Sequence, residues 1–183
     1  MNLSHHFLLA MPSLDNDSVF HQSVVYLCEH GESGALGLIV NKPSPVNMEI
    51  VFAAIGKPTP EKLQGQFVMM GGPVQPERGF VLHTPTGEWE SSLHINDSLA
   101  LTTSRDIIDG LAKDEAIDAA ILTIGCSQWS AGQLERELAQ NAWLVAPADM
   151  RILFDTPIEE RYNAALGKLG VDAAHLMVEG GNA

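Results

Sequence analysis

Ser23-Val-Val-Tyr-Leu-Cys28 and Ala35-Leu-Gly-Leu-Ile-Val40 are two short apolar runs, and the turn-forming segment Gly31-Glu-Ser-Gly34 separates them. The runs contain β-branched residues and are bounded by turn formers, a pattern that is typical of a buried β-hairpin. Polar residues follow each run, so polar groups are expected beside an apolar core. The rim of this hairpin is therefore the first place to look for a functional surface.

Several polar side chains are expected to form one patch at this rim. Glu29 and His30 follow the first run, and Asn41 follows the second. These three side chains are expected to meet because the two strands are adjacent and are joined by a short turn. The candidate polar rim patch comprises Glu29, His30, Asn41, Lys42, Arg78 and His83.

Arg78 and His83 flank another strand pattern, Gly79-Phe-Val-Leu82. Burying an unpaired guanidinium is costly, so Arg78 is expected to lie against a carboxylate. Glu29 is the candidate partner, with Glu77 and Glu135 as competitors for the same ion pair. An internal ion pair is the preferred role of Arg78, and a ligand's carboxylate is the alternative.

The remaining patterns predict a mixed α/β fold. Strands are expected near residues 6–11, 66–71, 79–84, 92–101, 118–125 and 143–146, and helices near 48–55, 104–113, 131–141 and 157–169. Several links between strands are too short for parallel crossovers, so the sheet is at least partly antiparallel. We therefore expect one domain over residues 1–183, an α/β fold with a mixed, strongly curved sheet and helices packed outside.

Composition narrows the function classes. The chain has 183 residues and a formal net charge of −13, and its ten Lys and Arg residues are scattered singly. Nucleic-acid binding draws its affinity from clustered cations at phosphates, so no direct nucleic-acid binding is expected. An acidic surface keeps a protein soluble or meets a basic partner.

The two cysteines, Cys28 and Cys126, each end an apolar run and are expected to be buried, reduced thiols. The amino terminus has no basic region, and Phe7-Leu-Leu-Ala-Met11 is too short for a signal-peptide core. No run approaches the ~18 apolar residues of a membrane span. A cytoplasmic protein without a membrane anchor is the expectation.

No motif completes a catalytic or metal signature. The segment from Gly71 to Gly79 lacks the residues of a phosphate loop and is interpreted as a strand connection. The seven histidines show no metal-ligand spacing, so no metal and no cofactor are expected. Ser130-Ala-Gly-Gln133 predicts a capped helix start, with anion binding at that start as the alternative. Gln133 and Glu135 are therefore secondary site candidates.

Six parts of the chain carry a resemblance that runs from end to end in the same order. They are His6–Pro12, Phe20–His30, Gly34–Pro43, Gly71–Val74, Gly79–His83 and Gly132–Leu138 with Asn141–Trp143. Together they resemble the YqgE/AlgH family of bacterial proteins. The resemblance implies a compact α/β domain whose bifurcated sheet curls into a pseudo-barrel. It implies no catalytic residues, and one branch of the family is named as a transcriptional regulator.

Three function classes stay open. The leading hypothesis is a non-enzymatic cytosolic protein, a monomer or small homo-oligomer, that binds a partner protein or a small ligand with a regulatory effect. The second is an enzyme whose site gathers Glu29, His30, Arg78, His83 and one cysteine. The third is a transcriptional regulator, which only the family name suggests and which the acidic charge opposes.

Overall fold

The computed structural model of the protein describes residues 1–16, 19–113 and 117–170. Its strands form a ten-stranded sheet with the order β10-β1-β2-β3-β9-β6-β8-β7, while β4 and β5 branch from β9. The strands are β1 (His6–Ala10), β2 (Val24–Gly31), β3 (Gly34–Ile39), β4 (Pro43–Asn47), β5 (Phe67–Met70), β6 (Val74–Thr84), β7 (Ser92–His94), β8 (Ala100–Thr102), β9 (Ala119–Ser130) and β10 (Trp143–Pro147). The mixed, strongly curved α/β sheet expected from the sequence is confirmed.

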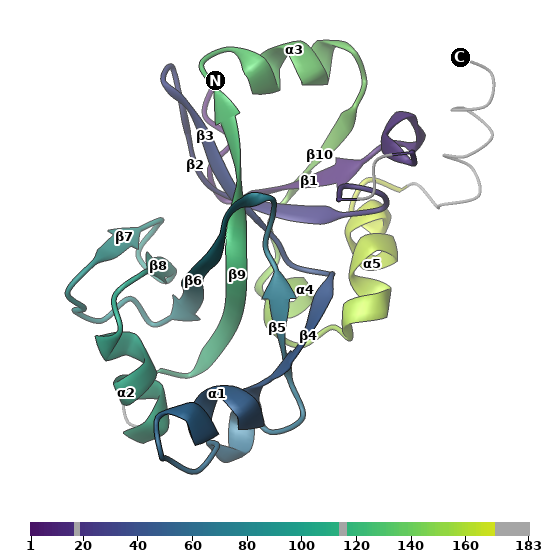
Figure 1. Cartoon of the computed structure of the whole chain (residues 1–183). Coiled ribbons are helices and arrows are strands. Elements are labelled where there is room, and N and C mark those ends of the chain that lie inside the picture. Colours follow the sequence, from purple (N-terminus) through teal and green to yellow (C-terminus); the bar gives the residue numbers. More distant parts are fainter. Residues whose placement is uncertain (17–18, 114–116, 171–183) are drawn as a thin grey trace.

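Strand β9 joins the two halves of the sheet and runs through the middle of the molecule (Figure 1). Its carboxyl-terminal half pairs with β3, where Ser127 lies opposite Gly37. Its amino-terminal half pairs antiparallel with β6 and parallel with β5, where Thr123 lies opposite Met69. The sheet therefore divides along β9, which is the bifurcation that the family resemblance implies.

Glycines allow the chain segments to approach one another closely at this division. A Cβ atom on Gly72, whose φ is 151°, would lie 2.3 Å from the carbonyl oxygen of Cys126. A Cβ atom on Gly71 would lie 2.4 Å from the carbonyl oxygen of Gly125. No larger residue fits these positions without moving the backbone. The connection between β5 and β6 is short, from Gly71 to Pro73, and the residues from Val74 to Gly79 are already the start of β6. The segment joins two strands, as the sequence predicts, and does not open a helix as a phosphate loop would. We call Gly71 and Gly72 the glycine connection.

The predicted hairpin is β2 and β3, which pair antiparallel with Val25 opposite Ile39. Successive β2 side chains point to opposite faces of the sheet. Tyr26 and Cys28 enter one apolar core, while Val25 and Leu27 enter another. The near-continuous apolar run in the sequence reflects this burial on both faces.

Helices cover the outer faces of the sheet, as expected. The helices are α1 (Met48–Ala54), α2 (Asp106–Lys113), α3 (Gln133–Ala139), α4 (Met150–Phe154) and α5 (Arg161–Gly167), with short 3₁₀ turns at Pro12–Leu14, Glu61–Leu63 and Ile158–Glu160. Helix α3 inserts Leu134 into the core beside β1 and β2, whereas α1 and α2 pack on the other half through Phe52 and Leu111. Among the described residues, no helix is long and apolar enough to cross a membrane.

The structure differs from the sequence expectation in three local features. The strand expected at 92–101 is two strands, β7 and β8, because the Asn96 side chain accepts hydrogen bonds from the N–H groups of Ser98 and Leu99 and forms a turn. The helix expected at 157–169 is a 3₁₀ turn followed by α5. Strand β4 and helix α4 are too short to give a periodic signal in the sequence.

Candidate functional site

The residues expected at the hairpin rim do not form one patch. Asn41 follows the end of β3 and lies beside the start of β2, where its Oδ1 accepts from the Val24 N–H (2.9 Å). His30 lies near the other end, opposite Ala35. In an antiparallel hairpin the residue after the second strand meets the beginning of the first, about 20 Å from its end here. The expected meeting of Asn41 with Glu29 and His30 is therefore wrong.

His30 is buried and has two partners. Its Nδ1 accepts from the Leu3 N–H (2.9 Å), so the ring proton is assigned to Nε2, which donates to Glu135 Oε1 at 2.6 Å. This hydrogen bond lowers the pKa of the Glu135 carboxyl. The contacts join the amino-terminal segment, β2 and α3. Glu29, the neighbouring candidate, is exposed.

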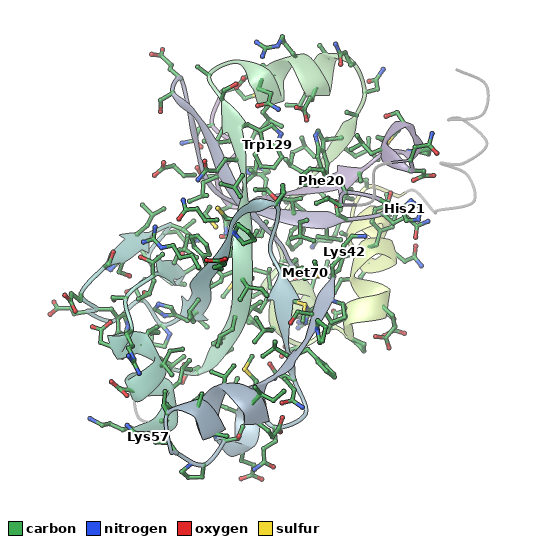
Figure 2. The ribbon with its side chains drawn as sticks, viewed as in Figure 1. Phe20, His21, Lys42, Lys57, Met70 and Trp129 are labelled. Atoms are coloured by element: carbon green, nitrogen blue, oxygen red, sulfur yellow. The ribbon has the colours of Figure 1, made fainter. Side chains whose placement is uncertain are left out.

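A second polar network lies beneath α3. It is centred on Glu137, which is not among the site candidates predicted from the sequence. Gln133 Oε1 accepts from the Ser130 N–H (3.0 Å), and its Nε2 donates to Glu137 (2.9 Å). This is one half of the predicted capping box, because α3 has Gly132 and not Ser130 as its N-cap. Glu137 Oε1 also accepts from the indole N–H groups of Trp129 (3.1 Å) and Trp143 (2.9 Å). Figure 2 labels Trp129 in the half of the molecule that contains α3. Gln133 and Glu137 are four residues apart and so lie on the same face of the helix, and this spacing is the sequence signal that points to Glu137.

His83 and Lys42 lie apart from both networks. His83 is fully buried, its Nδ1 donates to the Pro85 carbonyl (3.0 Å), and its Nε2 accepts from the Thr102 hydroxyl (2.7 Å). Burial lowers the pKa of its imidazole. Lys42 is in the link between β3 and β4, where its carbonyl accepts from the Met70 N–H (2.7 Å; Figure 2). His83 therefore ties strands together inside the core.

Arg78 is exposed on β6 and makes no ion pair with Glu29. Its Nη1 donates to Gln75 Oε1 (3.1 Å), and its guanidinium carbon lies 5.6 Å from the centre of the Phe80 ring. Within the described ranges, no carboxylate forms an ion pair with this guanidinium. The expected internal ion pair is thus wrong, and the alternative of an external anion stays open.

A groove of about 340 Å³ lies around Arg78, between the two halves of the divided sheet. Its lining combines hydroxyl and amide groups with apolar side chains, and Arg78 is the charged member. The lining residues are Leu36, Gln75, Arg78, Phe80, Ser91, Ser92, Leu93, Leu101, Thr103 and Gln128. In a protein with a net charge of −13, this groove is a local positive site.

An irregular stretch of β6 turns Arg78 toward the groove. Pairing with β9 shifts register between Val74 and Gly79, which marks a bulge. Gln75 within this stretch has a φ of 46°, an uncommon backbone conformation for a residue with a side chain. Such conformations cluster at functional sites, because the surrounding fold must hold them in place. The bulge in β6 and the groove around Arg78 lie at the same place, and both mark it as a candidate site.

The nearby thiol does not complete a catalytic group. Burial raises the pKa of Cys126, and this effect exceeds the lowering by the Arg78 charge and the Gln128 amide. Cys28 is also buried with a raised pKa, and both cysteines are free, as the sequence predicts. Because His30, His83 and Arg78 lie on separate networks, the cluster that the enzyme hypothesis requires is not formed.

Several known proteins are similar to this chain over most or all of its length. A family model described as AlgH-like matches residues 7–174. The chain is 56% identical to a UPF0301 protein of Neisseria meningitidis serogroup B over the full length of both, and 50% identical to one of Chromobacterium violaceum over 100% of this chain and 98% of that one.

Two solved structures share the fold. The solution structure of AlgH from Pseudomonas aeruginosa matches with a TM-score of 0.79 and 43% identity, covering 97% of this chain and 94% of that one. A crystal structure of a Corynebacterium diphtheriae protein matches with a TM-score of 0.70 and 22% identity, over 88% of this chain and 84% of the other, which shows the fold alone. The divided, curved sheet, the glycine connection and the full-length similarity lead to one conclusion: the chain belongs to the AlgH-like family.

Proposed function

We propose that this protein is a non-enzymatic binding protein whose Arg78 groove takes a small organic anion with an apolar body. The observation that carries the proposal is a guanidinium without a carboxylate partner among the described residues, placed in a groove of about 340 Å³. Arg presents a rigid fork of donors that matches a carboxylate. Small-molecule sites are typically concave and of ~300–1,000 Å³, with a few polar groups that fix orientation.

The other lining residues support binding without chemistry. Among the described residues of the groove, none carries a carboxylate or an imidazole, so no general base lines it. Phe80, Leu36 and Leu93 offer apolar contact, and Gln128 and Ser92 offer hydrogen bonds beside the guanidinium. The two free, buried thiols support placing this function in the reducing cytoplasm.

The test is equilibrium binding of benzoate, followed by ligand-observed NMR on the full chain. Benzoate combines a carboxylate with an apolar ring, and benzamide has the same shape without the charge. The protein is expected to bind benzoate and to bind benzamide at least tenfold more weakly. Arg78→Gln is expected to weaken benzoate binding by roughly tenfold to a hundredfold, the equivalent of one charged hydrogen bond.

Arg136→Gln is the matched control, because Arg136 is an exposed arginine on α3, away from the groove. This variant is expected to bind benzoate as the original protein does. Equal loss of binding in both variants, or equal binding of benzoate and benzamide, would contradict the proposal. Arg78 is exposed, so its replacement is expected to leave the fold intact and the comparison interpretable.

A further inference from the structure

Arg161, the first residue of α5, places a guanidinium in the interior with only 8% of the residue exposed. Its Nε donates to the Thr156 carbonyl (2.9 Å), and its Nη1 donates to the Val40 carbonyl. Among residues 1–16, 19–113 and 117–170, no carboxylate forms an ion pair with it, and no hydrogen bond joins Nη2 to an acceptor. Burial lowers the pKa of Arg161, while the nearby Glu159 carboxylate opposes that change.

A buried cation of this kind is unusual, because buried charges are normally paired with an opposite charge. Two carbonyl groups satisfy part of the donor set but supply no full negative charge. The Glu159 carboxylate is near enough to act on Arg161 but forms no ion pair with it, so Nη2 has no charged acceptor among the described residues. A ligand with a carboxylate would provide one.

Arg161 lines a cavity of about 270 Å³ between β5, β9, the end of α4 and the start of α5 (Figure 1 locates these elements). Apolar side chains form much of the wall, among them Phe67, Met69, Leu153 and Ile158. Phe67 is 41% exposed, which is high for a large apolar side chain and leaves its ring available to a ligand. The cavity thus offers a buried positive group beside an apolar surface.

Two carboxylates, those of Asp155 and Glu159, also line the cavity, and both residues are exposed. They oppose a ligand with several negative charges, such as a polyphosphate. They favour a ligand that carries a positive group toward the solvent side. The cavity thus presents a guanidinium, an apolar wall and two carboxylates. One molecule that matches all three has a carboxylate, an apolar body and an ammonium group.

We propose that this cavity is a binding site for an apolar α-amino acid, distinct from the Arg78 groove. The carboxylate of the amino acid pairs with Arg161, and its ammonium group lies near Asp155 and Glu159. Its side chain contacts Phe67, Met69 and Leu153. The cavity volume, slightly below the usual range for drug-sized ligands, suits a molecule as small as leucine.

The test is a titration of the full isotope-labelled protein with L-leucine, followed by amide NMR shifts. Saturable shifts are expected at Phe67, Met69 and Leu153, with N-acetylleucine and leucinamide each binding at least tenfold more weakly because each lacks one charge. Arg161→Lys keeps a cation but loses the planar set of guanidinium donors, and it is expected to weaken leucine binding at least tenfold. Arg136→Gln, which replaces an exposed arginine on α3, is the control and is expected to leave the leucine-induced shifts at the cavity unchanged.

Glu159→Gln keeps the proposal testable if replacement of the buried arginine impairs folding. Glu159 is exposed, so the variant is expected to fold, to bind leucine several-fold more weakly and to bind N-acetylleucine no more weakly than before. The proposal would be overturned by the absence of saturable shifts at the cavity with leucine. Equal affinity for leucine, N-acetylleucine and leucinamide, or leucine binding that Glu159→Gln leaves unchanged, would overturn it as well.

Discussion

Glu137 holds the two tryptophans beneath α3 in place. Both indole N–H groups donate to one of its carboxylate oxygens, at 3.1 and 2.9 Å, and Gln133 donates to the other. The rings of Trp129 and Trp143 pack edge to face, with centroids 6.0 Å apart. A single acidic side chain therefore satisfies polar atoms that are otherwise enclosed in an apolar cluster.

Glu137→Ala is expected to destabilise the protein by about 2 kcal/mol, because it leaves two indole N–H groups without their acceptor. Urea unfolding followed by tryptophan fluorescence measures the loss. Glu137→Gln retains an oxygen acceptor and is expected to lose clearly less. Equal losses in the two variants would show that the acceptor is not what stabilises this region.

Asp149 gives a pH-dependent prediction. Its side chain accepts from the Arg151 N–H (2.8 Å) at the start of α4, and Lys168 Nζ lies 2.8 Å from its other oxygen. The Lys168 hydrogen bond, followed by the Arg151 N–H, lowers the pKa of this carboxyl below its ordinary value of 3.8. The stabilisation is therefore present above that value and is lost as the pH falls through the folded pKa.

Asp149→Ala is expected to cost about 1 kcal/mol at pH 7, as for loss of a helix cap, and clearly less near pH 2. Chemical denaturation at the two pH values measures the difference. Asp97→Ala, an exposed aspartate in the turn before β8, is the control and is expected to change stability little at either pH. A cost for Asp149→Ala that is independent of pH would contradict the role of its charge.

At the scale of elements, the meeting of β5, β6 and β9 organises the molecule. The glycine connection lets β5 and β6 lie on opposite sides of β9, with Phe80 opposite Thr123 on one side and Met69 opposite Thr123 on the other. The bulge in β6 that turns Arg78 toward the groove begins beside this connection. The groove thus depends on backbone geometry set several residues away.

Gly72→Ala is expected to destabilise the protein by about 3 kcal/mol, because its Cβ would overlap the Cys126 carbonyl and the backbone conformation is strained for any side chain. The free energy of unfolding in urea measures the effect. Gly79→Ala, seven residues later on β6, is the control. A Cβ there meets nothing within 4 Å, so its effect is expected within about 0.5 kcal/mol. Similar effects of the two changes would refute the close-approach argument.

The sequence predicts elements well where the signal is local. The hairpin, the long apolar strands and the helix expected at 131–141 follow from local patterns in the sequence, and all are present, the helix as the shorter α3. Side-chain partners depend on register and on segments distant in sequence, as in the contact of His30 with Glu135, 105 residues later. The Arg78–Glu29 pairing failed for the same reason, since the β6 bulge has no reliable sequence signature. Arg78 as a ligand-binding residue stays a prediction, which rests on an arginine beside a glycine turn in the sequence.

At the scale of the whole molecule, the net charge of −13 makes the Arg78 groove distinctive. Long-range attraction does not favour anions near an acidic protein, so a groove for an anion must act through short-range, geometrically defined contacts. We expect the same charge to oppose nucleic-acid binding. The transcriptional-regulator hypothesis therefore rests on the family name alone, with no physical argument for contact with DNA.

The isolated protein is expected to show no sequence-specific DNA binding at physiological salt, because duplex binding requires clustered cations to replace counterions. Fluorescence anisotropy with labelled duplexes, in the presence of competitor DNA, measures this. A submicromolar complex that survives the competitor would show that folding gathers a cationic surface despite the net charge.

The most direct test of the account is an amide NMR shift map of the full chain titrated with benzoate. The Arg78 groove predicts saturable shifts at Gln75, Arg78, Ser92 and Gln128, with none of comparable size around Glu137. In Arg78→Gln these shifts are expected to need at least tenfold more benzoate, while the spectrum keeps the dispersion of a folded protein. Shifts that lie outside the groove, or that saturate at the same benzoate concentration in Arg78→Gln, would contradict the claim that this guanidinium binds the ligand.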